Sequence, residues 1–137
     1  MIYRFGFPIR AVPKQSFRAA NGHGYQPKKV VDFKRTLQLM LRAQLKMQNK
    51  PICEPLSGAV KVCIEFVFQC PKNRLKSLSA EIPKLHKDTR PDLDNLCKAV
   101  WDAFNGIVWQ DDSQVAILIT AKWYGKQDEI IVIVEDL

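Results

Sequence analysis

The chain opens with a regular alternation of apolar and polar residues, which predicts a β-strand over residues 2–10. Pro8 favours a place near a sheet edge for this strand, because proline has no backbone N–H to donate. The same alternation recurs over residues 59–69 and over residues 115–124, so we predict two further strands there.

The last apolar segment, residues 129–135 (EIIVIVE), is apolar on both faces. This pattern predicts an interior strand or a strand that is covered at a subunit interface. Residues 125–128 form a predicted turn, and we therefore expect the segments 115–124 and 129–135 to pair as a hairpin.

Two other segments carry apolar residues near the 3.6-residue spacing of a helix. The first runs over about residues 30–49, and Pro51 ends it. The second covers residues 93–104. It ends at Asn105-Gly106, since both residues tolerate the left-handed conformation common at helix C-termini.

This order of elements predicts one small α+β domain over residues 1–137, with two main helices packed on a mixed β-sheet. The chain has no run of 18 apolar residues, so we expect no membrane partner. Its N-terminus lacks the apolar block and cleavage site of a secretory signal. The four cysteines lack metal-ligand spacing and are expected to be reduced thiols in a cytoplasmic protein.

Charge is distributed unevenly along the chain. Residues 1–90 contain 18 basic and 5 acidic residues, a net charge of +13, whereas residues 91–137 contain 3 basic and 9 acidic residues, a net charge of −6. A basic body with one acidic focus suits an enzyme that cleaves a phosphodiester polyanion. The total charge of +7 alone is equally compatible with a soluble basic protein.

Two acidic pairs flank the second predicted helix. Taken singly, Asp92 could cap the helix, Asp94 could favour its dipole, and Asp111-Asp112 could be a surface turn. Together the carboxylates repel one another, and a divalent cation would compensate this repulsion, since Mg²⁺ and Mn²⁺ prefer oxygen ligands. Lys98, one helical turn after Asp94, adds a cation suited to a phosphoryl oxygen.

The string DLDNLCKAVWDAFNG…QDDSQV closely resembles the RusA family of Holliday-junction resolvases, small endodeoxyribonucleases common in bacteria and prophages. The resemblance implies a RusA-like homodimer that binds four-way DNA junctions and cuts them with Mg²⁺ in DNA recombination and repair. It implies metal-binding carboxylates at Asp92, Asp94 and Asp112, with Asp111 as a further participant. It also implies a catalytic lysine at Lys98.

The predicted reaction is hydrolysis of a DNA phosphodiester, with paired incisions resolving the junction. Mg²⁺, or alternatively Mn²⁺, would lower the pKa of a bound water and stabilise charge on the attacking and leaving oxygens. Lys98 would neutralise the non-bridging oxygens. Asp102 lies on the same helical face as Lys98 and could orient it through an ion pair, although structural support is its expected role. Asn95 is expected to help the helix start.

Two segments between the predicted elements are basic. Residues 11–29 contain four basic residues and no acidic residue, and residues 70–90 contain six basic residues against two acidic residues, with room for a short helix around Leu75, Leu78 and Ile82. Each segment is either a DNA-contacting loop or a solvated connection. The candidate DNA-binding residues are Lys14, Arg18, Lys72, Arg74, Lys76, Lys84, Lys87 and Arg90.

Two other classes of function stay open. A metal-dependent phosphohydrolase acting on nucleotides would use the same carboxylates, but it leaves the basic charge of residues 1–90 unexplained. A module that binds branched DNA without cutting it would gain nothing from carboxylates concentrated against phosphate.

Overall fold

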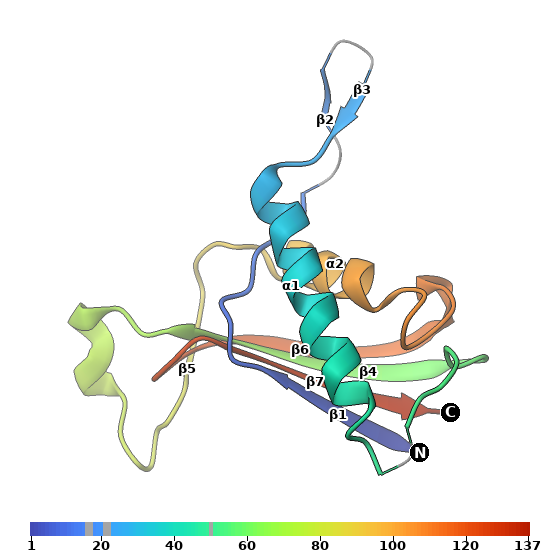
Figure 1. Ribbon diagram of the computed structural model, residues 1–137. Helices are drawn as coiled ribbons and strands as arrows, with labels where there is room; N and C mark the ends of the chain where they lie inside the picture. The colour runs from blue at the N-terminus through green and yellow to red at the C-terminus, as the bar shows by residue number, and fades with distance from the viewer. Residues whose placement is uncertain (16–17, 21–22, 50) are drawn as a thin grey trace.

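A five-stranded mixed sheet carries the fold of this computed structural model, which describes residues 1–15, 18–20, 23–49 and 51–137 (Figure 1). The strand order is β1-β7-β4-β6-β5; β4 and β6 are parallel, and the other neighbours are antiparallel. The bounds are β1 (Ile2–Phe7), β4 (Val60–Gln69), β5 (Leu85–His86), β6 (Val115–Gly125) and β7 (Glu129–Asp136). The predicted edge position of the first strand is confirmed.

The predicted hairpin of the last two strands is wrong, because β4 lies between β6 and β7. Cys63 of β4 pairs with Ile119 of β6 on one side and with Ile133 of β7 on the other. The turn after β6 therefore spans two strand spacings, about 10 Å, around the end of β4. Its Asp128 carboxylate accepts a hydrogen bond from the backbone N–H of Gln69 at 2.8 Å, which fixes the crossing. The alternative of an interior position for EIIVIVE is confirmed.

Two α-helices, α1 (Lys28–Leu45) and α2 (Leu93–Phe104), lie on one face of the sheet (Figure 1). The predicted α+β class, with a mixed sheet and two main helices, is thus confirmed. Phe104 of α2 lies at the centre of the core, with its ring centroid 5.6 Å from that of Phe5 and 5.6 Å from that of Trp109. Burial of such aromatic side chains is the main force that holds the helices on the sheet.

The first helix begins earlier and ends earlier than the apolar spacing predicts. It begins after Pro27, whose fixed φ of −57° suits the entry to a helix. It ends at Leu45, where the N–H of Met47 donates to the carbonyl of Gln44 and tightens the last turn. Leu45 is also the last buried residue of the helix, and the predicted extension to residue 49 lies beyond the apolar stripe.

Both basic segments contain short regular elements; the short helix expected in the second one is present, but it includes only Leu75 of the three apolar residues that suggested it. Strands β2 (Arg18–Ala20) and β3 (His23–Tyr25) form a separate two-stranded sheet that projects beyond the N-terminal end of α1 (Figure 1). The basic segment contains the 3₁₀-helix η1 (Lys72–Ser77) and returns to the sheet as β5. In the described ranges, no helix is both long enough and apolar enough to cross a membrane.

Candidate functional site

Helix α2 carries the first acidic pair at its N-terminus. Asp92 occupies the N-cap position with extended backbone angles (φ −69°, ψ 140°), yet its side chain makes no capping hydrogen bond. Asp94 lies in the first turn, and both side chains are exposed. The interpretation of Asp92 as a capping side chain is therefore wrong, and its carboxylate is available for another partner.

Lys98 lies one turn after Asp94 on the exposed surface of α2. Its amine is 3.5 Å from the amide oxygen of Asn95, at the long limit of a hydrogen bond. Asn95 supports the start of α2 in another way, since its carbonyl accepts a 2.9 Å hydrogen bond from the N–H of Lys14. This bond joins the segment before β2 to the first turn of α2.

Asp102 does not pair with Lys98, so the predicted ion pair between them is wrong. The Asp102 carboxylate lies 3.1 Å from the amine of Lys14 and 3.4 Å from the amine of Lys34. The i,i+4 spacing only permits a contact. Here Asp102 is half-buried and binds lysines from α1 and from the segment before β2, contacts that fit its expected structural role.

The second acidic pair lies at the 3₁₀-helix η2 (Asp112–Gln114), just before β6. The Asp111 carboxylate accepts a 3.0 Å hydrogen bond from the N–H of Ser113, and the Gln114 side chain accepts one of 2.8 Å from the N–H of Asp111. The bond from Ser113 holds the pKa of the Asp111 carboxyl below its usual value. Asp111 thus has a capping role that the sequence did not reveal, whereas Asp112 is exposed.

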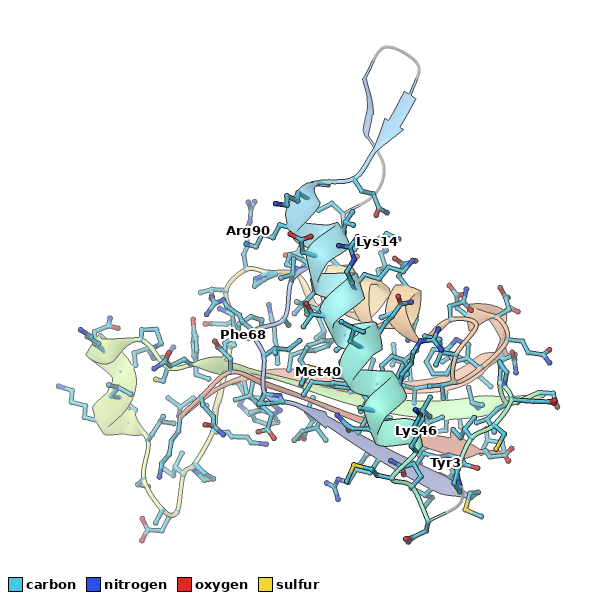
Figure 2. All side chains as sticks on the ribbon, viewed as in Figure 1. Tyr3, Lys14, Met40, Lys46, Phe68 and Arg90 are labelled. Atoms are coloured by element: carbon cyan, nitrogen blue, oxygen red, sulfur yellow. The ribbon has the colours of Figure 1, made fainter. Side chains whose placement is uncertain are left out.

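Two adjoining hollows gather five of the predicted site residues, whereas Asp94 and Asp111 line neither. The larger, of about 550 Å³, is lined by Pro13, Gln15, Arg90, Pro91, Asp92 and Asn95. The smaller, of about 200 Å³, is lined by Lys14, Gln15, Lys98, Trp101, Asp102, Asn105 and Asp112. Gln15 lines both hollows, so they adjoin along α2; Figure 2 labels Lys14 and Arg90, one from each.

The predicted metal ligands fit Mg²⁺ in kind but do not converge on one point. Carboxylate oxygens are the ligands that Mg²⁺ takes in proteins. Among the residues that the structure describes, however, no three His, Cys, Asp or Glu side chains lie close enough together to hold a metal ion. The metal-binding role of Asp92, Asp94, Asp111 and Asp112 therefore stays a prediction.

The predicted DNA-binding residues of the basic segment differ in their surroundings. Lys72, Lys76 and Arg90 are exposed. The Arg74 guanidinium stacks 5.3 Å from the centroid of the Tyr124 ring, and Lys84 pairs with a Glu65 oxygen at 3.3 Å. The three exposed residues are thus the best placed to meet phosphate.

Two other predicted DNA contacts have different outcomes. Lys87 is only 8% exposed, and its amine donates to the hydroxyls of Thr89 and Tyr124 at 2.7 and 3.2 Å. Because this amine is used inside the fold, we remove Lys87 from the set of phosphate contacts. The side chain of Arg18 lies outside the described residues, so its predicted contact is unchanged.

Sequence reasoning missed three residues at the site. Gln15 lines both hollows and Lys34 pairs with Asp102, but neither stands out in the sequence. Lys122 donates to two backbone carbonyls beside Asp92. The one feature that sets Lys122 apart is its position in β6. It pairs there with the fully buried Phe66 of β4, so a charged side chain lies on the face of the sheet that packs against the helices.

The fold is a small α+β domain with one acidic pair at the N-terminus of α2 and the other at η2. The family model described as Endodeoxyribonuclease RusA matches residues 7–135, and the chain belongs to that family, whose nucleases are metal-dependent. The chain is also similar to the uncharacterized protein YqaN of Bacillus subtilis (strain 168). The two are 31% identical over an alignment of 137 positions that covers 97% of this chain and 93% of YqaN.

Proposed function

We propose that the protein is a Mg²⁺-dependent, structure-specific endonuclease that resolves four-way DNA junctions by paired phosphodiester hydrolysis, in recombination and repair. The observation that carries this proposal is the pair of adjoining hollows along α2. One contains the uncapped carboxylate of Asp92 beside Arg90, and the other contains Lys98 beside Asp112. An exposed cleft with both carboxylates and cations suits a phosphodiester, which needs its charge neutralised while it is attacked.

Each side chain has a separate role in this proposal. The carboxylates of Asp92, Asp94 and Asp112, with Asp111 beside them, would hold Mg²⁺ or Mn²⁺. Such a metal would supply an activated water and charge stabilisation. The exposed Lys98 amine neutralises the non-bridging oxygens of the scissile phosphate, because no carboxylate in the described chain competes for it.

The basic part of the chain binds the DNA arms. Residues 1–90 carry a net charge of +13, and Lys72, Lys76 and Arg90 present exposed cations on the segment that leads into Asp92. Contacts of this kind hold the phosphate backbone irrespective of sequence. The protein thus recognises the DNA junction by the arrangement of its phosphate backbones, not by its base sequence.

The proposed active species is a homodimer. Strand β6 exposes Ile117, Leu118 and Ile119 to 44, 37 and 56%. Strand β5 pairs only with Trp123 and Tyr124, and within the described ranges no strand covers the rest of the outer edge of β6. An uncovered apolar strand edge is a surface for a second copy. A two-fold dimer would present one acidic cluster to each of two opposed DNA strands.

Cleavage of three substrates in Mg²⁺ tests the proposal: a four-way junction in a cruciform plasmid, a linear duplex of the same sequence, and a free nucleotide. We expect the plasmid to be linearised and the duplex to remain intact. Release of phosphate from the nucleotide would instead favour a phosphohydrolase. Junction binding without any incision would favour a non-cleaving DNA-binding module.

A further inference from the structure

Lys122 of β6 holds the backbone that leads into Asp92. Its amine donates to the carbonyl oxygen of Thr89 at 2.7 Å and to that of Pro91 at 2.8 Å. Both bonds have the short distances of charge-assisted hydrogen bonds. One side chain from the sheet therefore fixes two carbonyls in the three residues that precede Asp92.

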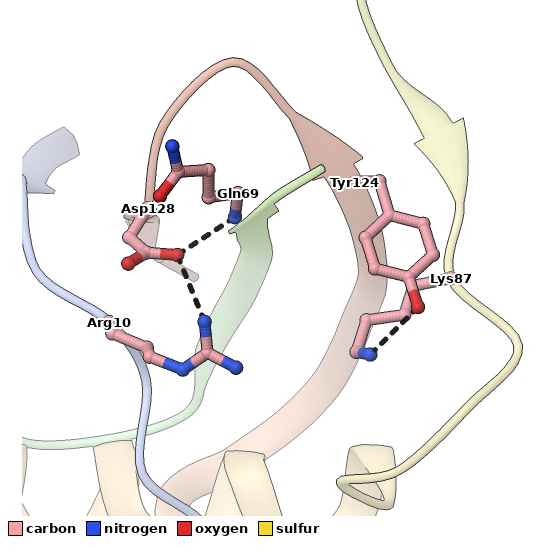
Figure 3. A network of polar contacts seen from close by, with 5 residues as sticks. All are labelled: Arg10, Gln69, Lys87, Tyr124 and Asp128. Atoms are coloured by element: carbon pink, nitrogen blue, oxygen red, sulfur yellow. Dashed lines mark hydrogen bonds and ion pairs between the residues drawn. The ribbon is translucent and has the colours of Figure 1, made fainter. Parts of the chain in front are cut away.

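The same turn is held by a second set of contacts from β6. The Tyr124 hydroxyl lies 2.9 Å from the hydroxyl of Thr89, and the buried Lys87 amine donates to both oxygens, as Figure 3 shows for the bond to Tyr124. The N–H of Lys87 also donates to the carbonyl of Lys122 at 3.1 Å. Thr89 is thus held through its hydroxyl and through its carbonyl at once.

These contacts matter at Asp92 because its carboxylate has no hydrogen-bond or ion-pair partner among the described residues. Asp92 follows Pro91 directly and makes no capping hydrogen bond, so the position of its Cβ depends on the backbone of this turn and on the first turn of α2, where its carbonyl accepts a 3.2 Å hydrogen bond from Leu96. The next acidic residue, Asp94, is in the first turn of the same helix and moves with it. We propose that Lys122 is a positioning residue for Asp92, acting through Thr89 and Pro91. The proposal rests on the nuclease function proposed above.

A lysine suits this role chemically. Its ammonium has three donors and can satisfy two carbonyls together, whereas an apolar side chain of similar length would leave both without a partner. Arginine can also bridge two carbonyls and should replace it in part. Removing an outer residue that orients a ligand typically costs about 10-fold to 100-fold in activity or metal affinity.

The test compares K122M with K122R, and with K126M as a matched control, because Lys126 is an exposed lysine in the turn after β6. Three quantities are measured: the single-turnover cleavage rate of a four-way junction in Mg²⁺, the junction affinity in EDTA, and amide hydrogen exchange over residues 89–94. We expect K122M to lower the rate about 10-fold to 100-fold with unchanged affinity and faster exchange at those amides. K122R should recover most of the rate, and K126M should match the wild type.

Two results would overturn the proposal. An unchanged rate and unchanged exchange in K122M would show that the turn does not depend on Lys122. Equal losses of rate and affinity would make Lys122 a DNA contact. If K122M did not fold, the variant Y124F would be used instead, because it removes one partner of Thr89. Y124F should lower the cleavage rate less than is expected of K122M, and a wild-type rate in Y124F would contradict the proposal. If the wild type cut no junction, the proposed function would fail, while hydrogen exchange would still decide whether Lys122 anchors the turn.

Discussion

The carboxylate of Asp102 lies 3.1 Å from the amine of Lys14, which joins α2 to the segment before β2. A second lysine, Lys34 of α1, approaches the same oxygen at 3.4 Å. With both lysines on Asp102, the Lys98 amine faces solvent and has only a weak contact with Asn95. The charges along α2 are thus divided between one structural residue, Asp102, and one amine available to phosphate.

This division predicts different outcomes for K98A and D102N. Loss of a donor to transition-state charge should make K98A slower by about 10²–10³-fold, with little change in junction affinity. D102N should leave the rate near that of the wild type and lower the free energy of unfolding by up to about 1 kcal/mol, because partly exposed ion pairs contribute little. Single-turnover cleavage and urea unfolding measure the two effects.

Lys98 would be only an anchoring residue if K98A cut normally but bound the junction poorly. A cleavage defect in D102N as large as that of K98A, with the fold intact, would contradict the assignment of Asp102 to structure.

The basic segment gives a prediction on salt dependence. Neutralising Lys72, Lys76 and Arg90 together should weaken junction binding. The slope of log affinity against log salt should also become shallower, by about 0.9 for each phosphate that the variant no longer neutralises. The measurement is junction affinity over a range of salt concentrations, in EDTA. The matched control removes the same number of charges from the exposed surface of α1 and its C-terminal end, at Arg35, Arg42 and Lys46.

A slope that is unchanged in the first triple variant would make the basic segment a solvated connection. A larger fall in the α1 variant would place the DNA on the helix surface instead. Lys87 is left out of the experiment because its amine lies inside the fold.

The cysteines predict a pattern of chemical reactivity. Cys97 is buried on α2, its thiol lies 3.6 Å from the Thr120 hydroxyl, and burial raises its pKa above the usual value of a thiol. Because the thiolate is the reactive form, iodoacetamide should label the exposed Cys53 well before Cys97 at pH 7–9. The thiol of Cys97 loses its proton at lower pH in the unfolded chain than in the folded one, so this group lowers the stability of the fold as pH rises above the usual pKa of a thiol. Mass spectrometry of labelled peptides checks the order, and equal labelling rates would contradict the burial of Cys97.

The sequence predicted the fold class and most elements because alternation and helical spacing are local signals. The strand pairing predicted from the sequence was wrong where a segment from another part of the chain lies between two strands. Strand β4 lies between β6 and β7 although it precedes both in the chain, and the short turn at residues 126–128 gives no sign of this. The faces of β6 were also ambiguous, since Ile117 and Ile119 lie on the exposed face, opposite the helices.

The sequence singles out the acidic residues of the candidate site, whose metal-binding role stays a prediction, but it does not reveal the residues that support them. Asp92, Asp94 and Asp112 stand out because the motif concentrates negative charge in a basic chain. The partners of Asp102 and the burial of Lys87 depend on contacts between segments far apart in the sequence. Spacing along a helix shows which side chains can meet, but tertiary structure decides which do.

Cleavage of a four-way junction by the wild type and by D94N, each with Mg²⁺ and with EDTA, tests the central claim most directly. The account predicts paired incisions by the wild type in Mg²⁺ and none in EDTA. D94N should not cut, yet it should bind the junction as tightly as the wild type or more tightly, because it removes a negative charge that repels phosphate. Cleavage by D94N at the wild-type rate, or cleavage by the wild type in EDTA, would contradict the account.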